Sequence, residues 1–526
     1  MRRDGRRLRL NARVVDGATG EQVWSGSFDR EVRDVFAVQA ELAAAVTAAI
    51  VPTFRGATGP VAPPTRDLDA HDHYLLGIAA QRSRWRERIE ESVVHLEQAV
   101  ALDPSYAEAQ AALARSLLLA WQYRASGSRD RLADPRLRRA EQAAHAALSL
   151  NPELSDAHGA LGNVLHYMGR PGAEEEYRRA LELNPNNALV AHDYGVLLGS
   201  QPGREADNDR LRALALRLDP RAAIVWVNQL ARVSETEGPE VVREQFARAM
   251  QVLAGDPDGL TTLLFAVGHA GSPLETYRAI DELRRAGADR VPASLAALPL
   301  LIAAGDYDEC LARIDRMRAA GEGAPLDFAP LEIMAAGLKG DAARLDRAIA
   351  VPERDTVPSQ YRFVMDAYWY AAQGRDDEAA DALAKAGDFE GARGGIAGSS
   401  LYTGALPAVV SIYRATGRER EATELVAGFR ARLQEDPALA QQDANHDLLL
   451  AELAMAAGDG AQAVRHLADA MERESIPDRL HPQLPWFRSL EAVPGYAGLV
   501  EELARRQAEL RAGIAAIDRA AGGTSD

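Results

Sequence analysis

A helix ending of nearly constant composition recurs four times in the first half of this chain. Each copy is an amphipathic run, such as LEQAVALDP or YRRALELNP, that stops at an Asp-Pro or Asn-Pro pair. Proline cannot continue a helix, and it disfavours helical backbone in the residue before it. Successive prolines lie 48, 33 and 35 residues apart, at Pro104, Pro152, Pro185 and Pro220. This spacing predicts a stack of helical hairpins, in which no single unit can bury its own apolar face.

Small residues recur at matching positions in these units and would let paired helices approach closely. The second helices carry Ser92, Ala99, Ala140, Ala147, Ala173 and Ala180, and the first helices carry the pairs Leu113-Ala114, Leu161-Gly162 and Tyr194-Gly195. A period near 34 residues with this pattern resembles the tetratricopeptide repeat family. The resemblance implies a mostly α fold, a tetratricopeptide-repeat α-solenoid well formed over residues 69–220. Its first helices would line a concave groove for a protein or peptide ligand.

Helical hairpins continue after Pro220, although the repeat pattern decays. Four segments each combine a Gly-containing turn with an amphipathic helix, at residues 303–314, 371–383, 414–426 and 456–471. We therefore expect degenerate tetratricopeptide-like hairpins over residues 221–484, followed by a C-terminal capping helix and tail at 485–526. Nothing in this half of the sequence predicts a separate catalytic domain.

Residues 1–51 follow a different pattern. From Leu8 to Val14 apolar and polar residues alternate, which is typical of a half-buried strand, and a turn-rich stretch leads to a second strand at 23–28. The sequence then predicts a helix from Asp34 to Ile50 and a Pro-rich linker at 52–68. A hairpin and one helix cannot bury a core alone. We expect the rest of this domain to be missing, supplied by a partner or replaced by packing on the repeats.

The first fifty residues resemble the last hairpin and helix of the α/β domain at the amino terminus of TolB. The turn and strand from Asp16 to Trp24 and the segment from Asp34 to Gln39 carry this similarity. In bacteria this domain often precedes tetratricopeptide repeats in proteins with an adenylate cyclase or a winged-helix regulator upstream. The resemblance implies a role in bacterial signalling. Because the earlier strands and helices of the domain are not in this sequence, we expect Met1 to be an internal GTG codon read as a start.

Composition excludes several classes of function. A formal net charge of −17 disfavours nucleic-acid binding by the surface as a whole. The single cysteine, Cys310, excludes a disulfide framework, a Cys-based zinc site and a two-thiol redox motif. No apolar run reaches the roughly 18–20 residues of a membrane-spanning helix, and no secretory signal follows Met1. The sequence as written therefore predicts a cytoplasmic protein, or a periplasmic one if a transmembrane helix lies upstream.

Motifs for catalysis are missing from the sequence as well. It contains no phosphate-binding loop, no dinucleotide-binding glycine motif, no His-Glu-x-x-His and no Gly-x-Ser-x-Gly. His71 and His73 could suggest a metal-binding pair, but we interpret them as a polar helix start. We interpret Cys310 as a buried, unreactive thiol. The sequence thus predicts no catalytic residue, no metal and no cofactor, and we expect no enzyme activity.

Polar side chains on the first helices are the candidates for partner binding. Aligned on the prolines, six of them face the predicted groove, and for each a plain surface role is an equal alternative: Glu108, Arg115, Asn163, His166, Tyr167 and His192. Tetratricopeptide proteins that bind chaperone C termini use a Lys/Asn/Arg carboxylate clamp. Only Asn163 matches that clamp here, since Gly159 and Asp193 stand at other clamp positions.

An arginine-rich insertion lengthens the second repeat by fourteen residues, between positions 121 and 139. Arg136, Arg138 and Arg139 are candidates for docking an acidic partner or a phosphate. The alternative interpretation is a solvated loop, and we do not expect nucleic-acid binding by this chain.

Two functions remain after these exclusions. The first is a non-enzymatic scaffold that mediates protein–protein interaction in bacterial signalling. The second is the C-terminal sensory or regulatory half of a longer adenylate cyclase or winged-helix transcriptional regulator. An enzyme hidden in residues 221–526 is a third, disfavoured reading. The sequence leaves the partner, the oligomeric state and any small effector open.

Overall fold

A computed structural model describes residues 2–4, 7–15, 22–31, 65–123, 134–351, 359–386, 405–435, 444–473, 476 and 480–522. The chain divides into two compact units. The first comprises residues Met1–Gln81, Glu87–Gln122 and Pro135–Ser200, and the second comprises Arg82–Arg86, Tyr123–Asp134 and Gln201–Asp526. The main division falls at residues 200 and 201, whereas the regular proline spacing continues to Pro220. The helix that ends at this last proline therefore belongs to the second unit.

The first described segments form a three-stranded antiparallel sheet in the order β1-β2-β3. Its strands are β1 (Arg2–Asp4), β2 (Arg7–Val15) and β3 (Gln22–Glu31). In the β2–β3 register, Leu10 stands opposite Phe28 and Val14 opposite Trp24. This antiparallel register of β2 and β3 confirms the predicted hairpin. β1 was not predicted, and the helix expected at 34–50 and most of the linker lie outside the described residues.

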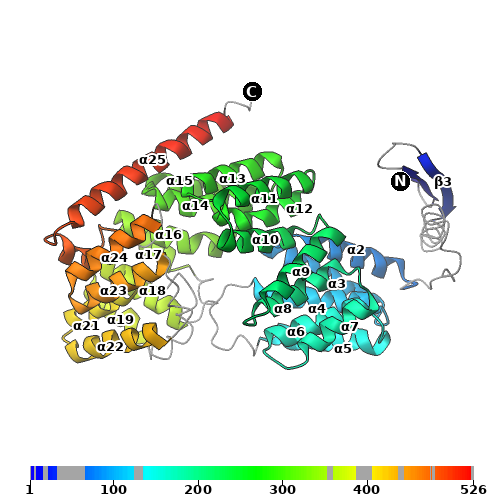
Figure 1. The fold of residues 1–526 in the computed structure, drawn as a ribbon, viewed down its shortest axis with the longest axis horizontal. Helices are drawn as coiled ribbons and strands as arrows, with labels where there is room; N and C mark the ends of the chain where they lie inside the picture. Colours follow the sequence, from blue (N-terminus) through cyan, green and yellow to red (C-terminus); the bar gives the residue numbers. More distant parts are fainter. Residues whose placement is uncertain are drawn as a thin grey trace. The chain divides into compact units, whose positions relative to one another are not determined.

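Helical hairpins make up the rest of the first unit (Figure 1). The first helices of successive repeats are α2 (Leu68–Arg82), α4 (Ala107–Gln122), α6 (Ser155–Tyr167) and α8 (Ala188–Gly199). The second helices are α3 (Arg86–Leu102), α5 (Pro135–Leu150) and α7 (Ala173–Leu183). α4 packs on α5 and α6, and α6 packs on α7. The predicted fold class, a mostly α chain of tetratricopeptide-type hairpins preceded by a β-hairpin, is confirmed.

The Asp-Pro and Asn-Pro pairs end their helices in the same way at all four repeats. The residue before proline leaves the helical region, as at Asn184, where φ is −140° and ψ is 92°. Its side-chain oxygen then accepts a hydrogen bond from the backbone N–H two residues later, at 2.9 to 3.1 Å, in the turns that start at Asp103, Asn151, Asn184 and Asp219. The short polar side chain therefore satisfies a backbone donor in the turn that follows the helix.

Close helix approach explains the small residues. A Cβ added to Gly162 on α6 would lie 3.1 Å from ring atoms of Tyr177 on α7. Tyr177 is fully buried, so its ring has no room to move aside. A Cβ added to Gly77 on α2 would lie 2.5 Å from the Leu96 side chain on α3. A glycine in the first helix therefore receives a large side chain from the second helix of the same repeat.

The second unit continues as helical hairpins through the segments in which the sequence pattern decays. In chain order its elements begin with α9 (Glu205–Leu218), α10 (Ala223–Thr236), α11 (Pro239–Val252), α12 (Pro257–Leu263), the 3-10 turn η3 (Leu264–His269), α13 (Pro273–Ala286), α14 (Arg290–Ala303) and α15 (Tyr307–Ala319). They are followed by α16 (Pro325–Lys339), α17 (Ala342–Ile349), α18 (Ser359–Ala372), α19 (Asp376–Ala386), α21 (Leu406–Ala415), α22 (Glu419–Glu435), α23 (Ala444–Ala457), α24 (Gly460–Arg473), the 3-10 turn η6 (Pro485–Leu490) and α25 (Tyr496–Gly522).

The last helix, α25, packs along much of the second unit. Near its start Arg506 donates to the carbonyl of Met471 at the end of α24, and further on Arg511 donates to the carbonyl of Ala304. Near its end Asp518 accepts hydrogen bonds from Tyr277 on α13 and Arg313 on α15, at 2.7 and 2.5 Å. α25 therefore runs back from the final hairpin to α13 (Figure 1), and the capping role expected for residues 485–526 stays a prediction. Among the described residues, no helix has both the length and the apolar character needed to cross a membrane.

Candidate partner-binding site

Three first helices of the first unit converge on one carboxylate, that of Asp193 on α8. Arg115 on α4 forms an ion pair with it, with Nη2 2.8 Å from Oδ2, and Asn163 on α6 donates from Nδ2 at 2.7 Å. The side chains of Arg115 and Asp193 are each only 12% exposed. We call Arg115, Asn163, His166, His192 and Asp193 the Asp193 cluster, because the two histidines also lie close enough to interact with this carboxylate. Four of the six predicted groove residues are thus brought together.

Charge balance inside the cluster favours an ionised Asp193. Burial raises the pKa of this carboxyl, but Arg115, His192 and the Asn163 amide outweigh it and leave the pKa below its ordinary value. The Asn163 amide oxygen accepts a hydrogen bond from the buried Tyr177 hydroxyl at 2.8 Å. Burial lowers the pKa of His166, although Asp193 opposes this. The cluster therefore holds the Arg115–Asp193 ion pair, and the imidazole of His166 is neutral at neutral pH.

Aromatic rings extend the cluster along α6. The imidazole of His166 stacks on Tyr167 with ring centroids 4.8 Å apart, and Tyr167 meets the edge of Trp121 on α4 at 5.9 Å. His166 and Tyr167 are partly exposed. Flat rings at a partly exposed site supply contact area at a low cost in side-chain entropy.

Glu108, the sixth predicted residue, lies away from Asp193 and close to Asp156, at the first turns of α4 and α6. Burial, reinforced by Asp156, raises the pKa of Glu108. Burial and these two carboxylates also raise the pKa of Tyr74 on α2 to about 12. Asp156 accepts a hydrogen bond from the Asn187 amide at 2.7 Å. We call Glu108 and Asp156 the acidic pair; in the described part of the chain neither forms an ion pair with an Arg, Lys or His.

A carboxylate clamp does not fit this geometry. Arg115 already pairs with Asp193, and Asn163 donates to the same carboxylate. Gly159 leaves no room for a longer side chain, since a Cβ there would lie 2.5 Å from Val190 on α8. A ligand carboxylate would have to displace the internal one. The site instead offers aromatic rings and two uncompensated carboxylates.

Two of the three described arginines of the insertion make contacts within the first unit. Arg136 donates to Glu90 on α3 at 3.0 Å, and Arg139 forms an ion pair with Glu97 on the same helix. Arg138 is exposed on α5. Residues 124–133, which carry the other arginines of the insertion, lie outside the described residues. The predicted docking role of the three arginines remains a prediction, and their visible contacts connect α5 to α3.

The two histidines at the start of α2 point to different partners. His71 is buried, with Nδ1 3.1 Å from the Tyr106 hydroxyl. His73 lies instead against His95 on α3, and the two Nδ1 atoms are 3.0 Å apart. The sequence therefore missed the neighbour of His73, because His95 comes from the second helix of the hairpin. Cys310 is fully buried, and burial raises the pKa of its thiol to about 12.

A pocket of about 400 Å³ lies in the second unit, between α21, α23 and η6. Its lining is chiefly apolar and includes Val410, Met455 and Trp486. Arg414 stands at its edge and donates to the Ala456 carbonyl at 3.1 Å. Sequence reasoning did not find this pocket, because its walls come from three elements of low repeat character.

Asp193 is the functional candidate that the sequence reasoning passed over. Arg115 and Asn163 each lie eleven residues after the proline that opens their repeat, and Asp193 lies one turn earlier in the next repeat. Polar residues within one helical turn of the same repeat position in successive first helices were therefore the available signal. The sequence could not show that these side chains pair with one another rather than with a ligand.

Comparison with known proteins gives short or distant similarities, and no family model matches. A protein of Rhizobium meliloti (strain 1021) named as an adenylate cyclase is 40% identical over 50 residues, 10% of this chain and 8% of that protein. The type IV pilus assembly protein PilF of Pseudomonas aeruginosa is 34% identical over 114 residues, 21% of this chain and 45% of that protein. The chain thus spans less than half the length of either relative.

The solved structures that resemble this chain are also distant from it in sequence and in fold geometry. A structure of Pseudomonas aeruginosa PilF is 20% identical with a TM-score of 0.27, covering 41% of this chain and 94% of that chain. Yeast Tom70 is 11% identical with a TM-score of 0.37, covering 83% of this chain and 100% of that chain. Likenesses this low in TM-score do not bear on function. Its own repeats and helical hairpins identify the chain as a tetratricopeptide-like helical-repeat protein.

Proposed function

We propose that this chain is a non-enzymatic scaffold that binds a protein or peptide partner on the first helices of its first unit. The observation that carries the proposal is the acidic pair. Glu108 and Asp156 stand on successive first helices with no cation of the described chain beside them, while Arg115 is neutralised by Asp193. Glu108 is half-buried and Asp156 is exposed, and a carboxylate left without a counterion favours an incoming opposite charge. The net charge of −17 favours a basic partner in the same way.

The expected ligand is a segment that presents a Lys or Arg to the acidic pair and an apolar or aromatic side chain to His166 and Tyr167. Exposed Leu75 and Leu76 on α2 add apolar surface on the neighbouring first helix. A bacterial signalling role fits the similarity of the first fifty residues to the TolB-type domain. PilF, which shares partial sequence similarity with this chain, is named as a type IV pilus assembly protein and so is an example of a related protein with a role in assembly.

Photo-crosslinking in the native cells identifies the partner. A crosslinking amino acid at position 167 should capture a protein that the same amino acid at the exposed position 175 on α7 does not. Binding of the purified partner is then measured by calorimetry at low and high salt. Glu108→Gln with Asp156→Asn should weaken binding about five- to ten-fold at low salt, and the difference should shrink as salt rises.

Glu175→Gln is the matched control, because Glu175 is also a first-turn carboxylate but lies on a second helix. Unchanged binding after loss of the acidic pair, or an equal loss with Glu175→Gln, would contradict the proposal. Hydrolysis or cyclisation of ATP by the purified chain would contradict its non-enzymatic character.

The second candidate is the regulatory half of a longer adenylate cyclase or winged-helix regulator. The similarity over 50 residues to a protein named as an adenylate cyclase favours it. The intact mass of the native protein, captured through a chromosomal C-terminal tag, tests this candidate. A mass equal to the sequence plus the tag supports the free scaffold, whereas a mass larger by a whole domain supports the longer regulator.

A further inference from the structure

α23 and α24 form a tight antiparallel hairpin in the second unit. Gly458 turns the chain with φ at 81°, and Asp459 accepts hydrogen bonds from the N–H groups at the start of α24. Buried Leu448, Ala451 and Leu467 belong to the core on which the two helices pack. Residues early in α23 therefore lie beside residues late in α24.

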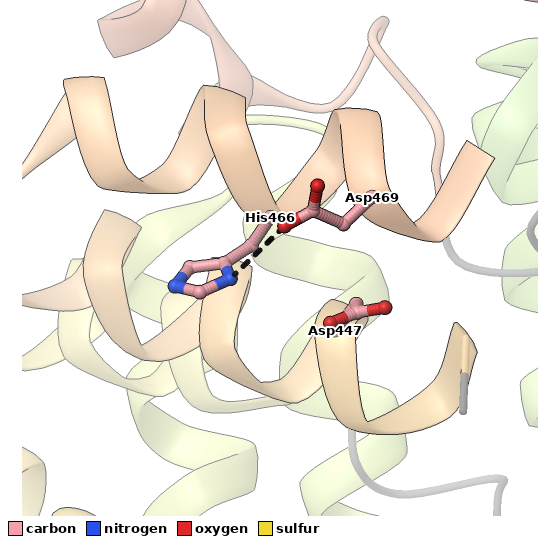
Figure 2. A group of neighbouring side chains, drawn as sticks. All are labelled: Asp447, His466 and Asp469. Atoms are coloured by element: carbon pink, nitrogen blue, oxygen red, sulfur yellow. Dashed lines mark ion pairs between the residues drawn. The ribbon is translucent and has the colours of Figure 1, made fainter. Parts of the chain in front are cut away.

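Three side chains from this hairpin place metal-ligand atoms together: Asp447 from α23, and His466 and Asp469 from α24 (Figure 2). One atom of each lies within 4.8 Å of the other two. His466 Nδ1 is 3.9 Å from Asp469 Oδ2, too far for a hydrogen bond. This nitrogen is buried and has no hydrogen-bond partner among the described residues. We call these three residues the hairpin triad.

Burial and charge distinguish the triad from an ordinary surface ion pair. The Asp447 side chain is only 9% exposed, whereas that of Asp469 is 55% exposed. Arg473 Nε holds Asp447 Oδ2 at 2.7 Å. Two carboxylates against one guanidinium leave a net negative charge beside a buried imidazole nitrogen. A divalent cation would balance that charge and use the free nitrogen.

We propose that Asp447, His466 and Asp469 bind a divalent transition-metal ion, for which Zn²⁺ is the best fit. Imidazole nitrogen and carboxylate oxygen are both ligands that Zn²⁺ binds in proteins, and three protein ligands leave a fourth tetrahedral position open to solvent. A tetrahedral ion with bonds of about 2.0–2.2 Å needs its ligands closer together than they stand here. Exposed Asp469 can close this distance by rotating its side chain.

Arg473 is compatible with the ion. A carboxylate has two oxygens, so Asp447 can bind metal with one while the other stays with Arg473. Partners of this kind orient a metal ligand and tune its affinity. The bound ion would join α23 to α24 and stabilise the final hairpin, which α25 contacts through Arg506 and the Met471 carbonyl. The sequence predicted no metal site, because Asp447 and His466 come from different helices.

The test is calorimetric titration of the metal-free full-length protein with ZnCl₂. His73 and His95 form a separate imidazole pair in the first unit, so the titration is done in a His73→Ala, His95→Ala background. We expect one Zn²⁺ per chain. His466→Ala and Asp469→Asn should each weaken binding by at least the roughly 10- to 100-fold that loss of an outer ligand partner costs. Asp469 is exposed, so its variant should fold normally.

His145→Ala is the matched control, since His145 lies 3.9 Å from Glu141 on one helix without a third ligand. It should leave the affinity for Zn²⁺ unchanged. As an independent readout, Zn²⁺ should raise the Tm of the background protein, as any ligand of the folded state does, and should not raise that of Asp469→Asn. No binding of Zn²⁺ by the background protein would overturn the proposal. So would equal binding by the background protein, His466→Ala and Asp469→Asn.

Discussion

Arg115 Nη2 lies 2.8 Å from Asp193 Oδ2, although the helices that carry them, α4 and α8, are separated in the chain by three others. Asn163, on the first helix between them, donates to the same carboxylate. The ion pair therefore crosses three repeats of the first unit. It stabilises their stacking and removes Arg115 from the set of free ligand-binding groups.

Loss of the Asp193 charge should destabilise the first unit. Asp193→Asn keeps the shape of the side chain but leaves Arg115 without its counterion, and breaking a buried pair in this way costs about 3 kcal/mol. The free energy of unfolding from urea titration, followed by hydrogen exchange in α4, α6 and α8, measures the effect. The control Glu182→Gln breaks an exposed pair with Arg179 and should cost less than about 0.5 kcal/mol. Equal losses in the two variants would show that the Asp193 pair is no stronger than a surface pair.

Stability should fall as the pH drops below about 6.5. Burial lowers the pKa values of His71 and His166 in the first unit and His269 in the second, each below the ordinary histidine value of 6.5. The unfolded chain then takes up protons at a higher pH than the folded one, so the free energy of unfolding decreases from pH 6.5 down to the lowered pKa values. Urea unfolding at a series of pH values measures this slope. His166→Gln should reduce the slope in the first unit only, and a slope unchanged by this variant would contradict the assignment.

Adding a single methyl group at Gly162, the glycine of the α6–α7 repeat, should destabilise the protein. The Cβ of Gly162→Ala would lie 3.1 Å from the fully buried ring of Tyr177, whose hydroxyl is tied to Asn163. We expect a loss of about 1–3 kcal/mol in the free energy of unfolding. Gly498→Ala in α25 meets nothing within 4 Å and should be neutral or stabilising by about 0.5–1 kcal/mol. Thermal and urea unfolding of both variants decide the matter, and a neutral Gly162→Ala would count against the close helix approach.

Charge reversal of single arginines in the insertion should distinguish those that stabilise the fold from those that bind a partner. Arg136→Glu places two carboxylates together at Glu90 and should cost about 1 kcal/mol of unfolding free energy. Arg138→Glu, at an exposed position, should change that free energy by less than about 0.5 kcal/mol. If the insertion docks an acidic partner, Arg138→Glu weakens that binding without loss of stability. Unfolding curves and partner titrations on the same preparations distinguish the two effects.

Local and periodic features of the chain could be predicted from the sequence because their causes are local. Asn184 and Pro185 end α7 through backbone sterics, and the alternation from Leu8 to Val14 predicted the strand β2. Gly162 marked a close helix contact, which the ring of Tyr177 fills. These patterns also predicted the tetratricopeptide-like hairpins and four of the residues that meet at the Asp193 cluster.

Tertiary structure alone decided which side chains pair. Arg115 was a candidate for partner binding with a surface role as the equal alternative, and the stacking of α4 and α8 places it against Asp193. The sequence predicted a terminal helix here, and only the contacts of Asp518 with Tyr277 and Arg313 show that α25 runs back along the unit. The hairpin triad likewise depends on the pairing of α23 with α24. Periodicity determines the faces of each helix, whereas the contacts between distant helices follow from the sum of all the packing angles and have no signature in any one segment.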